Sequence, residues 1–382
     1  MKHLLFVFVI VCIFSCSGKN EISIDPLSFI SDTTVITIDR RTEPYTRTLQ
    51  YVNGDLYWWN SNRETISQID LSAQKVKNFI NLERDGPNGL GNPLGFFVMT
   101  PDSIYIPTMP FELSLINSQG NWIADYDYYQ HSLKGDVAAS MTRYSGMIQT
   151  NNSGVLYLRI PDLKHLSTQE LTEENLEKYP LILSFNSSEW TFNYLEFNAP
   201  PSLLEFNDFI DFGITATDNS LLLLHAQSNS LLSYDFKNKK SEEYFLQSKS
   251  IRNFSNEYYL SPRMSLSVEE NMRLAYKSAE NFGLTFDSYK NLLYRFGWPG
   301  EEIPQDADPT QFSATPPYFV ISIYNGTDFS LIKEFTLPRN TYLAHHYFVD
   351  EKGLNLFPMH PENPEFNEDE MVIHTFDFSG LK

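Results

Sequence analysis

The side chains best suited to binding chemistry are three arginines, each beside an aromatic or proline residue at a predicted strand end. They are Arg143 in Arg143-Tyr144, Arg263 in Ser261-Pro262-Arg263 and Arg295 in Tyr294-Arg295-Phe296. Guanidinium forks beside rings can hold anionic groups or sugar hydroxyls. We expect at least two of them to approach one another at the mouth of a channel and bind a ligand. The alternative is that each arginine braces the fold through backbone carbonyls.

The eight histidines are scattered, apart from the adjacent pair His345-His346. Neighbours in a strand point to opposite faces, so this pair cannot hold one metal ion together. Both residues open the last sequence repeat, and we add them to the candidate ligand-binding residues. The segment Asp306-Ala307-Asp308 resembles part of a calcium loop but lacks its glycine and glutamate spacing, so a polar loop is expected. No metal site is predicted.

Signatures of common catalytic and nucleotide-binding sites are missing from the sequence. It contains no G-x-S-x-G, no H-E-x-x-H and no P-loop, so neither catalytic residues nor a cofactor is predicted. The formal net charge is −20, with 28 basic and 48 acidic residues and no basic run. Because clustered Lys and Arg bind phosphate backbones, this composition argues against nucleic acid as a partner. It also disfavours direct adsorption to anionic lipid.

An internal repeat predicts the elements that would position these residues. Short apolar runs recur at spacings of 48 to 71 residues, each after a polar turn and before a second strand that ends in a hairpin turn. The middle residues of these runs are Tyr57, Tyr105, Tyr157, Leu223, Tyr294 and Asn355. Six copies indicate an all-β fold, a six-bladed β-propeller with four-stranded antiparallel blades, formed by residues 33–382 as one domain. The alternative is a β-sandwich with coincidental spacing.

Two further features complete the predicted propeller. The alternating segment Thr33 to Asp39 is expected to pair with Met371 to Phe378 and close the ring. Two short helical insertions begin at capping boxes, Ser167 to Glu170 and Ser267 to Glu270. The first would end near Tyr179. The second would end near Gly283 and place Met272, Ala275, Tyr276 and Ala279 on one face. Such insertions either form a binding face or cap the channel mouth.

The N-terminus predicts export and lipidation. Leu4 to Phe14 is an apolar run of 11 residues, too short for the about 20 residues of a membrane-spanning helix but typical of a signal peptide. The following Ser15-Cys16 resembles a bacterial lipobox, in which Cys16 is lipidated after removal of residues 1–15. Residues 16–32 would form the tether. Cleavage removes Cys12, so no disulfide is expected. The alternative is ordinary secretion with Cys16 incidental.

A glycine-rich loop supplies the most specific motif of the chain. Glu83 to Gly91 reads E-R-D-G-P-N-G-L-G, a tight turn between the first and second repeats. With the lipobox and Tyr294-Arg295-Phe296, it resembles a family of uncharacterised propeller lipoproteins from Bacteroidetes-type bacteria. This family is classed as a domain of unknown function and is similar to TolB-like six-bladed propellers. The resemblance covers residues 16 to 382. It implies the propeller fold and a cell-envelope location, and it carries over no catalytic residues.

The expected function is that of a lipid-anchored envelope protein, an outer-membrane lipoprotein facing either the periplasm or the cell surface. It would be a monomeric, non-enzymatic module that binds an envelope protein, a glycan or a small anionic ligand. Its contact with the membrane would be through the lipid alone. The alternative is a propeller hydrolase or lyase with its site in the central channel. Titratable groups converging within hydrogen-bonding distance there would favour the enzyme.

Overall fold

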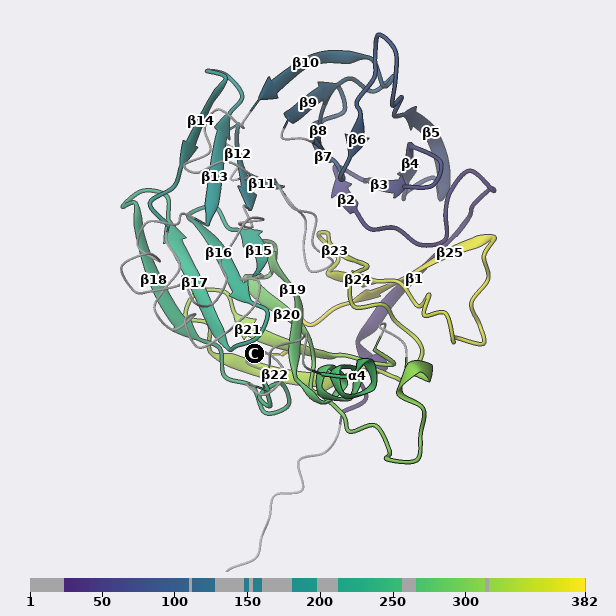
Figure 1. The fold of residues 1–382 in the computed structure, drawn as a ribbon, viewed down its shortest axis with the longest axis vertical. Coiled ribbons are helices and arrows are strands. Elements are labelled where there is room, and N and C mark those ends of the chain that lie inside the picture. The colour runs from purple at the N-terminus through teal and green to yellow at the C-terminus, as the bar shows by residue number, and fades with distance from the viewer. Residues whose placement is uncertain are drawn as a thin grey trace, which may run out of the picture.

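The computed structural model describes residues 24–109, 112–127, 148–150, 154–159, 181–197, 212–255, 266–312 and 316–381. In these ranges the strands form six antiparallel sheets arranged around a centre as a six-bladed β-propeller (Figure 1). The predicted fold class is therefore confirmed. Among the described residues, no helix has the length and apolar character needed to cross a bilayer.

Each blade has four main strands, numbered here from the innermost outward. Blade one contains β2 (Leu49–Val52), β3 (Asp55–Asn60), β4 (Thr65–Asp70) and β5 (Lys75–Asn81). Blade two contains β7 (Phe97–Thr100), β8 (Ser103–Met109), β9 (Glu112–Ile116) and β10 (Trp122–Asp127), with the short β6 (Asn92–Pro93) also pairing with β8. Blade three contains β11 (Ile148–Thr150), β12 (Val155–Arg159), β13 (Ile182–Asn186) and β14 (Thr191–Tyr194).

The second half of the chain forms the other three blades. Blade four contains β15 (Phe212–Ala216), β16 (Ser220–His225), β17 (Ser230–Asp235) and β18 (Lys240–Phe245). Blade five contains β19 (Glu280–Asp287), β20 (Leu292–Trp298), β21 (Val320–Asn325) and β22 (Leu331–Thr336). Blade six contains β23 (Tyr347–Val349), β24 (Leu354–Leu356), β25 (Glu370–Phe376) and β1 (Ile30–Thr37).

The repeat found in the sequence corresponds to the second strand of every blade. Its six aligned residues lie in β3, β8, β12, β16, β20 and β24. The polar turn before each copy is the hairpin between the first and second strands. In blade one this turn is Asn53-Gly54, whose φ angles of 50° and 90° are the left-handed values that two-residue hairpin loops require. Local turn chemistry and apolar alternation therefore specify where each blade begins.

The ring is closed by β1, as predicted. It pairs antiparallel with β25 in a register that joins Thr33 to His374 and Thr37 to Glu370. A 3₁₀ turn, η1 (Pro26–Phe29), precedes it and is capped by Asp25, whose Oδ1 accepts from Leu27 N at 3.0 Å. The ring of Phe29 packs against buried rings of blades five and six. Residues 30–32, which the sequence assigned to the tether, thus belong to the closing strand, and Phe29 and Ile30 pack on the core between blades five and six.

The connections differ at the two ends of the blades. First and second strands are joined by tight turns such as 217–219 and 288–291, and third and fourth strands by turns such as 236–239 and 326–330. Because the strands are antiparallel, both sets lie at the same end of a sheet, which we call the short-turn face. Longer connections, including 246–279 and 299–319, lie at the opposite end, the long-loop face.

One predicted helical insertion is found on the long-loop face. Helix α4 (Val268–Lys277) begins with the expected capping box: Ser267 Oγ accepts from Glu270 N at 3.2 Å, and Glu270 Oε2 accepts from Ser267 N at 2.9 Å. It ends at Lys277 rather than near Gly283, because the chain from Glu280 onward forms β19. The other predicted helix, 167–179, lies outside the described residues.

The segment Asp306-Ala307-Asp308 is a capped turn, in line with the predicted polar loop. Asp308 Oδ1 accepts from Thr310 N at 2.9 Å and begins the 3₁₀ helix η5 (Pro309–Gln311). Nearby, Arg273 of α4 donates to the carbonyls of Pro304 and Ala307 at 3.0 and 2.7 Å. These bonds hold the connection between β20 and β21 against the helix.

Side chains also link the inner strands of neighbouring blades. The amide of Gln50 on β2 donates to Val98 O at 3.0 Å and accepts from Val98 N on β7 at 2.7 Å. Between blades four and five, Thr215 Oγ1 on β15 accepts from Phe286 N on β19 at 3.2 Å. Such bonds satisfy backbone groups that face a neighbouring blade and fix one blade relative to the next.

The glycine-rich loop joins blades one and two. Leu90 N donates to Glu83 O at 2.8 Å, and Asn88 Oδ1 accepts from Trp122 N on β10 at 3.2 Å. Leu90 is buried in the core between these blades. Gly89 is required because an added Cβ would lie 2.8 Å from Arg84 O. The most specific motif of the sequence is therefore a structural connection.

Candidate functional site

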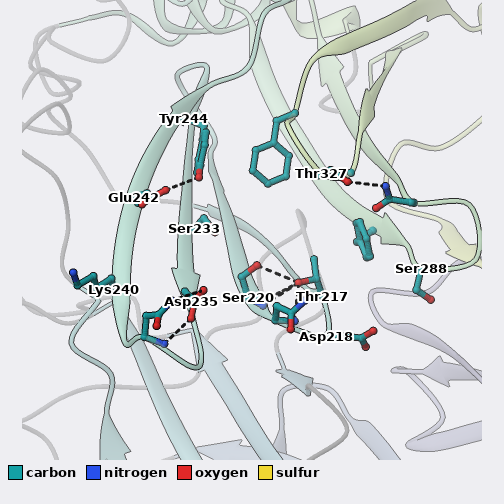
Figure 2. Close-up of a pocket in the computed structure, with 16 residues that line it drawn as sticks. Thr217, Asp218, Ser220, Ser233, Asp235, Lys240, Glu242, Tyr244, Ser288 and Thr327 are labelled. Carbon is teal, nitrogen blue, oxygen red and sulfur yellow. Dashed lines mark hydrogen bonds between the residues drawn. The ribbon is translucent and has the colours of Figure 1, made fainter. Parts of the chain in front are cut away.

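A groove with a volume of about 480 Å³ opens between blades four and five, at the short-turn face (Figure 2). Strand β18 and the turns of blade four form one wall, and the turns of blade five form the other. The lining residues are Thr217, Asp218, Asn219, Ser220, Ser233, Asp235, Asn238, Lys240, Glu242, Tyr244, Phe286, Ser288, Asn291, Gly326, Thr327 and Phe329.

Strand pleating directs the side chains of β18 into this groove. Lys240, Glu242 and Tyr244 are alternate residues and therefore share one face of the strand. On β17, Ser233 is the register partner of Glu242, so its side chain lies beside Glu242 on the same face. The third and fourth strands of blade four thus present a polar surface toward blade five.

The groove adjoins an apolar core between the two blades. Buried leucines from β16, β17, β19 and β20 fill the interface with Tyr324, and Tyr244, Phe286 and Phe329 pack against this cluster. The rings of Tyr244 and Phe329 meet edge to face with centroids 4.9 Å apart. The interface is therefore apolar toward the inner strands and becomes polar toward the outer edge.

Hydrogen bonds fix the polar lining. Tyr244 Oη donates to Glu242 Oε2 at 2.5 Å, and this bond to a carboxylate raises the pKa of Tyr244. Asp235 Oδ1 accepts from the backbone N–H groups of Lys237 and Asn238 at 2.8 and 2.6 Å. Across the groove, Asn291 Nδ2 donates to Thr327 Oγ1 at 2.9 Å (Figure 2). Both walls are thus held in defined conformations.

Several lining groups have unused hydrogen-bonding capacity. Within the described part of the chain, no hydrogen bond or ion pair engages the side chains of Asp218, Ser233, Lys240 or Ser288. They supply two hydroxyls, one carboxylate and one ammonium. With Asp235 and Glu242, the groove carries three carboxylates against one ammonium. The site can therefore exchange hydrogen bonds with a polar ligand, and its charge disfavours anions.

Arg295, a predicted ligand-binding residue, is fully buried between blades four and five. Its Nε donates to Asn281 Oδ1 at 2.7 Å, and its Nη2 donates to Asn229 Oδ1 at 2.7 Å. Its Nη1 lies 3.3 Å from the Tyr324 hydroxyl, which it can donate to. This geometry favours the bracing role that the sequence left open for the arginines.

The two predicted histidines lie at the start of blade six. His346 is buried, its Nε2 accepts from Thr46 N at 3.2 Å, and its ring packs against Trp58 with centroids 5.5 Å apart. Burial lowers the pKa of His346 to about 4, so the ring is neutral at pH 7. The ring of His345 packs edge to face on Phe282 of blade five, with centroids 5.4 Å apart. Each histidine thus contacts a different neighbouring blade.

The other predicted site residues, Arg143, Arg263 and Cys16, lie outside the described residues. The sequence analysis did not identify the groove residues. The one feature of the sequence that could have indicated the groove is the polar alternation of Lys240, Glu242 and Tyr244 in an outer strand. It could be recognised as a site only once the turns of blade five were known to face it. Within the described ranges, no three His, Cys, Asp or Glu side chains gather as metal ligands.

The fold and groove define a six-bladed propeller with a polar site between two blades. The sequence profile of a domain of unknown function, DUF4221, matches residues 19–336, and the chain belongs to this family. A search of curated proteins found no match. This membership agrees with the resemblance found in the sequence.

Solved structures show the same fold. A crystal structure of a DUF4221 family member from Bacteroides vulgatus superposes with a TM-score of 0.76 at 20% identity, covering 91% of this chain and 97% of that one. A candidate exported protein from Bacteroides fragilis superposes with a TM-score of 0.57 at 10% identity, covering 92% and 95%. At these identities the similarity establishes the fold alone.

Proposed function

We propose that this protein is an exported lipoprotein, anchored through Cys16, that acts as a non-enzymatic binding module of the cell envelope. The groove between blades four and five is the observation that carries the binding role. Its hydroxyls and Lys240 are available to a ligand, while the carboxylates of Asp235 and Glu242 are already bound to a turn and to Tyr244. Groups held in this way favour recognition over proton transfer.

Export is supported by the signal peptide and lipobox of the sequence, and by the fold shared with the candidate exported protein from Bacteroides fragilis. The direction of β1 adds a consequence. Its first residue, Ile30, pairs with Phe376 at the end of β25, so the chain enters the propeller from the short-turn face. Asp25 follows Cys16 by nine positions in the sequence. A chain of that length spans at most about 30 Å, which keeps this face near the membrane.

The anchoring is tested by the substitution Cys16→Ala in the full-length chain. We expect the wild-type protein in the membrane fraction and the variant in the soluble exported fraction, because the variant lacks the acylated cysteine. Mass spectrometry of the mature N-terminus is the direct measurement. The matched control is Cys12→Ala, which should remain anchored because cleavage removes residue 12. An unmodified Cys16 in the wild-type protein would refute the proposal.

A further inference from the structure

We propose that the groove between blades four and five binds a neutral saccharide. The inference rests on the proposed binding function and specifies its site and ligand class. Three observations support it: the chemistry of the lining, the open space beside Ser233 and Glu242, and the balance of charge.

The lining offers both types of surface that a sugar ring presents. A saccharide carries hydroxyls around its edge, each able to donate and accept, and C–H groups on its faces. Ser233, Ser288 and Asp218 can exchange hydrogen bonds with such an edge. Tyr244 and Phe329 supply adjoining apolar rings. Pockets with a few placed polar groups beside aromatic surface are typical of small-molecule sites.

Rings of the fourth strands pack between neighbouring blades, and by register Tyr244 of β18 holds the place of Phe335 in β22 and of Tyr126 in β10. Between blades five and six, Phe29, Phe335 and Phe378 pack together with centroid distances of 5.1 to 5.6 Å. Between blades two and three, Tyr126 packs on Phe185 at 4.7 Å. Between blades four and five, Tyr244 packs on Phe329 in the same way, and the groove lies beside this ring pair.

Next to this ring pair, Ser233 lies beside Glu242 on the wall of the groove, and the space in front of them is open. Leucine or phenylalanine at position 233 would extend the apolar core of this interface outward. A small hydroxyl there forgoes that burial, which is worth about 1.5–3 kcal/mol for a large apolar side chain. An open polar groove beside packed rings is the arrangement that a bound polar molecule would use.

The charges select a neutral ligand. Asp218, Asp235 and Glu242 repel an anion, so a phosphate, sulfate or uronic acid is disfavoured. Of the carboxylates that a cationic ligand would need, Asp235 accepts from its own turn and Glu242 from Tyr244, which leaves Asp218. Lys240 also repels cations. A neutral hydroxyl-rich molecule can use all these groups as hydrogen-bond partners without forming an ion pair.

The test is binding of the purified full-length mature protein to an immobilised array of neutral, acidic and amine-bearing glycans. We expect signals from neutral glycans. The variant Ser233→Leu should lower them at least tenfold, because leucine fills the groove. The control is Ser241→Leu on the other face of β18, which should bind as the wild type does. A second variant, Glu242→Gln, keeps the side-chain shape and should weaken binding severalfold by removing a charged acceptor.

The outcomes separate this inference from the proposed function. Loss of neutral-glycan binding in Ser233→Leu, with an unchanged melting temperature, supports the site. If Ser233→Leu unfolds, a severalfold loss of neutral-glycan binding by the folded variant Glu242→Gln supports the site. Equal binding by folded Ser233→Leu and wild type would exclude the groove while leaving a binding module in place. Signals confined to acidic or amine-bearing glycans, or an array without signals, would overturn the ligand class. An unmodified Cys16 would refute the anchoring without affecting this result.

Discussion

Arg295 places a guanidinium inside the interface of blades four and five, where its described partners are neutral oxygens. Asn281 and Asn229 each accept one of its N–H groups through a side-chain amide. Burying a charge is costly unless hydrogen bonds replace its hydration. The buried guanidinium therefore needs partners from both blades, and this requirement fixes how the two blades are placed relative to each other.

We expect Arg295→Ala to lower the free energy of unfolding by about 3 kcal/mol, since each buried acceptor left unpaired costs about 1–3 kcal/mol. Urea unfolding followed by tryptophan fluorescence measures the change. The control is Arg339→Ala, which removes a largely exposed ion pair with Glu301 and should cost about 1 kcal/mol or less. A similar small loss for Arg295→Ala would show that this residue does not brace the blades.

His346 makes stability depend on pH. Burial lowers its pKa in the folded state from the ordinary value of 6.5 to about 4, so the unfolded chain takes up a proton first as the pH falls. The contribution of neutral His346 to the free energy of unfolding is complete above pH 6.5 and decreases between pH 6.5 and about 4. Its slope is at most about 1.4 kcal/mol per pH unit. His225, whose pKa burial lowers to about 3, acts in the same direction.

The variant His346→Gln tests this contribution, because glutamine does not titrate. Unfolding free energies are measured at several pH values between 7 and 4 for both proteins, so that shared carboxylate titrations cancel in the difference. The wild type should lose stability faster than the variant on acidification. Parallel curves would show that His346 is protonated without penalty in the folded protein.

Among the elements, β1 has the largest consequence for the whole ring. It contributes Ile36 to the core between blades six and one, the residue directly after its end, Ile38, packs there too, and both side chains are buried. Without it, β25 would present an unpaired edge with free N–H and C=O groups, which favours aggregation. Blade six thus combines three strands from the C-terminal part of the chain with an outer strand, β1, from the N-terminal part.

Deletion of residues 1–39, expressed without export, should lower the melting temperature on the order of 10 °C and promote aggregation. Each of the two isoleucines contributes about 1.5–3 kcal/mol by burial. Differential scanning calorimetry and light scattering measure the two effects. The matched control is deletion of residues 1–24, which leaves Asp25 and η1 intact and should melt like the longer protein. Equal melting of both truncations would contradict closure through β1.

At the level of the whole molecule, the sequence predicts the architecture well because the signals are local. The Asn53-Gly54 turn and the alternation of β1 are read within a few residues. The end of α4 was misplaced because Ala279 fits a helical face, whereas its burial comes from the chain entering β19. The groove could not be predicted, since Glu242 and Ser288 are distant in sequence and meet only through blade packing.

The closing strand also determines how the molecule would carry mechanical load. The proposed lipid anchor would pull on the N-terminal end of β1, at the face from which the chain leaves the propeller. Force applied there acts along the strand, so the hydrogen bonds between β1 and β25 resist it together in shear. They would not open one after another, as in unzipping. With that anchor, the paired register from Ile30 to Thr37 would be the mechanical link between the membrane and the propeller.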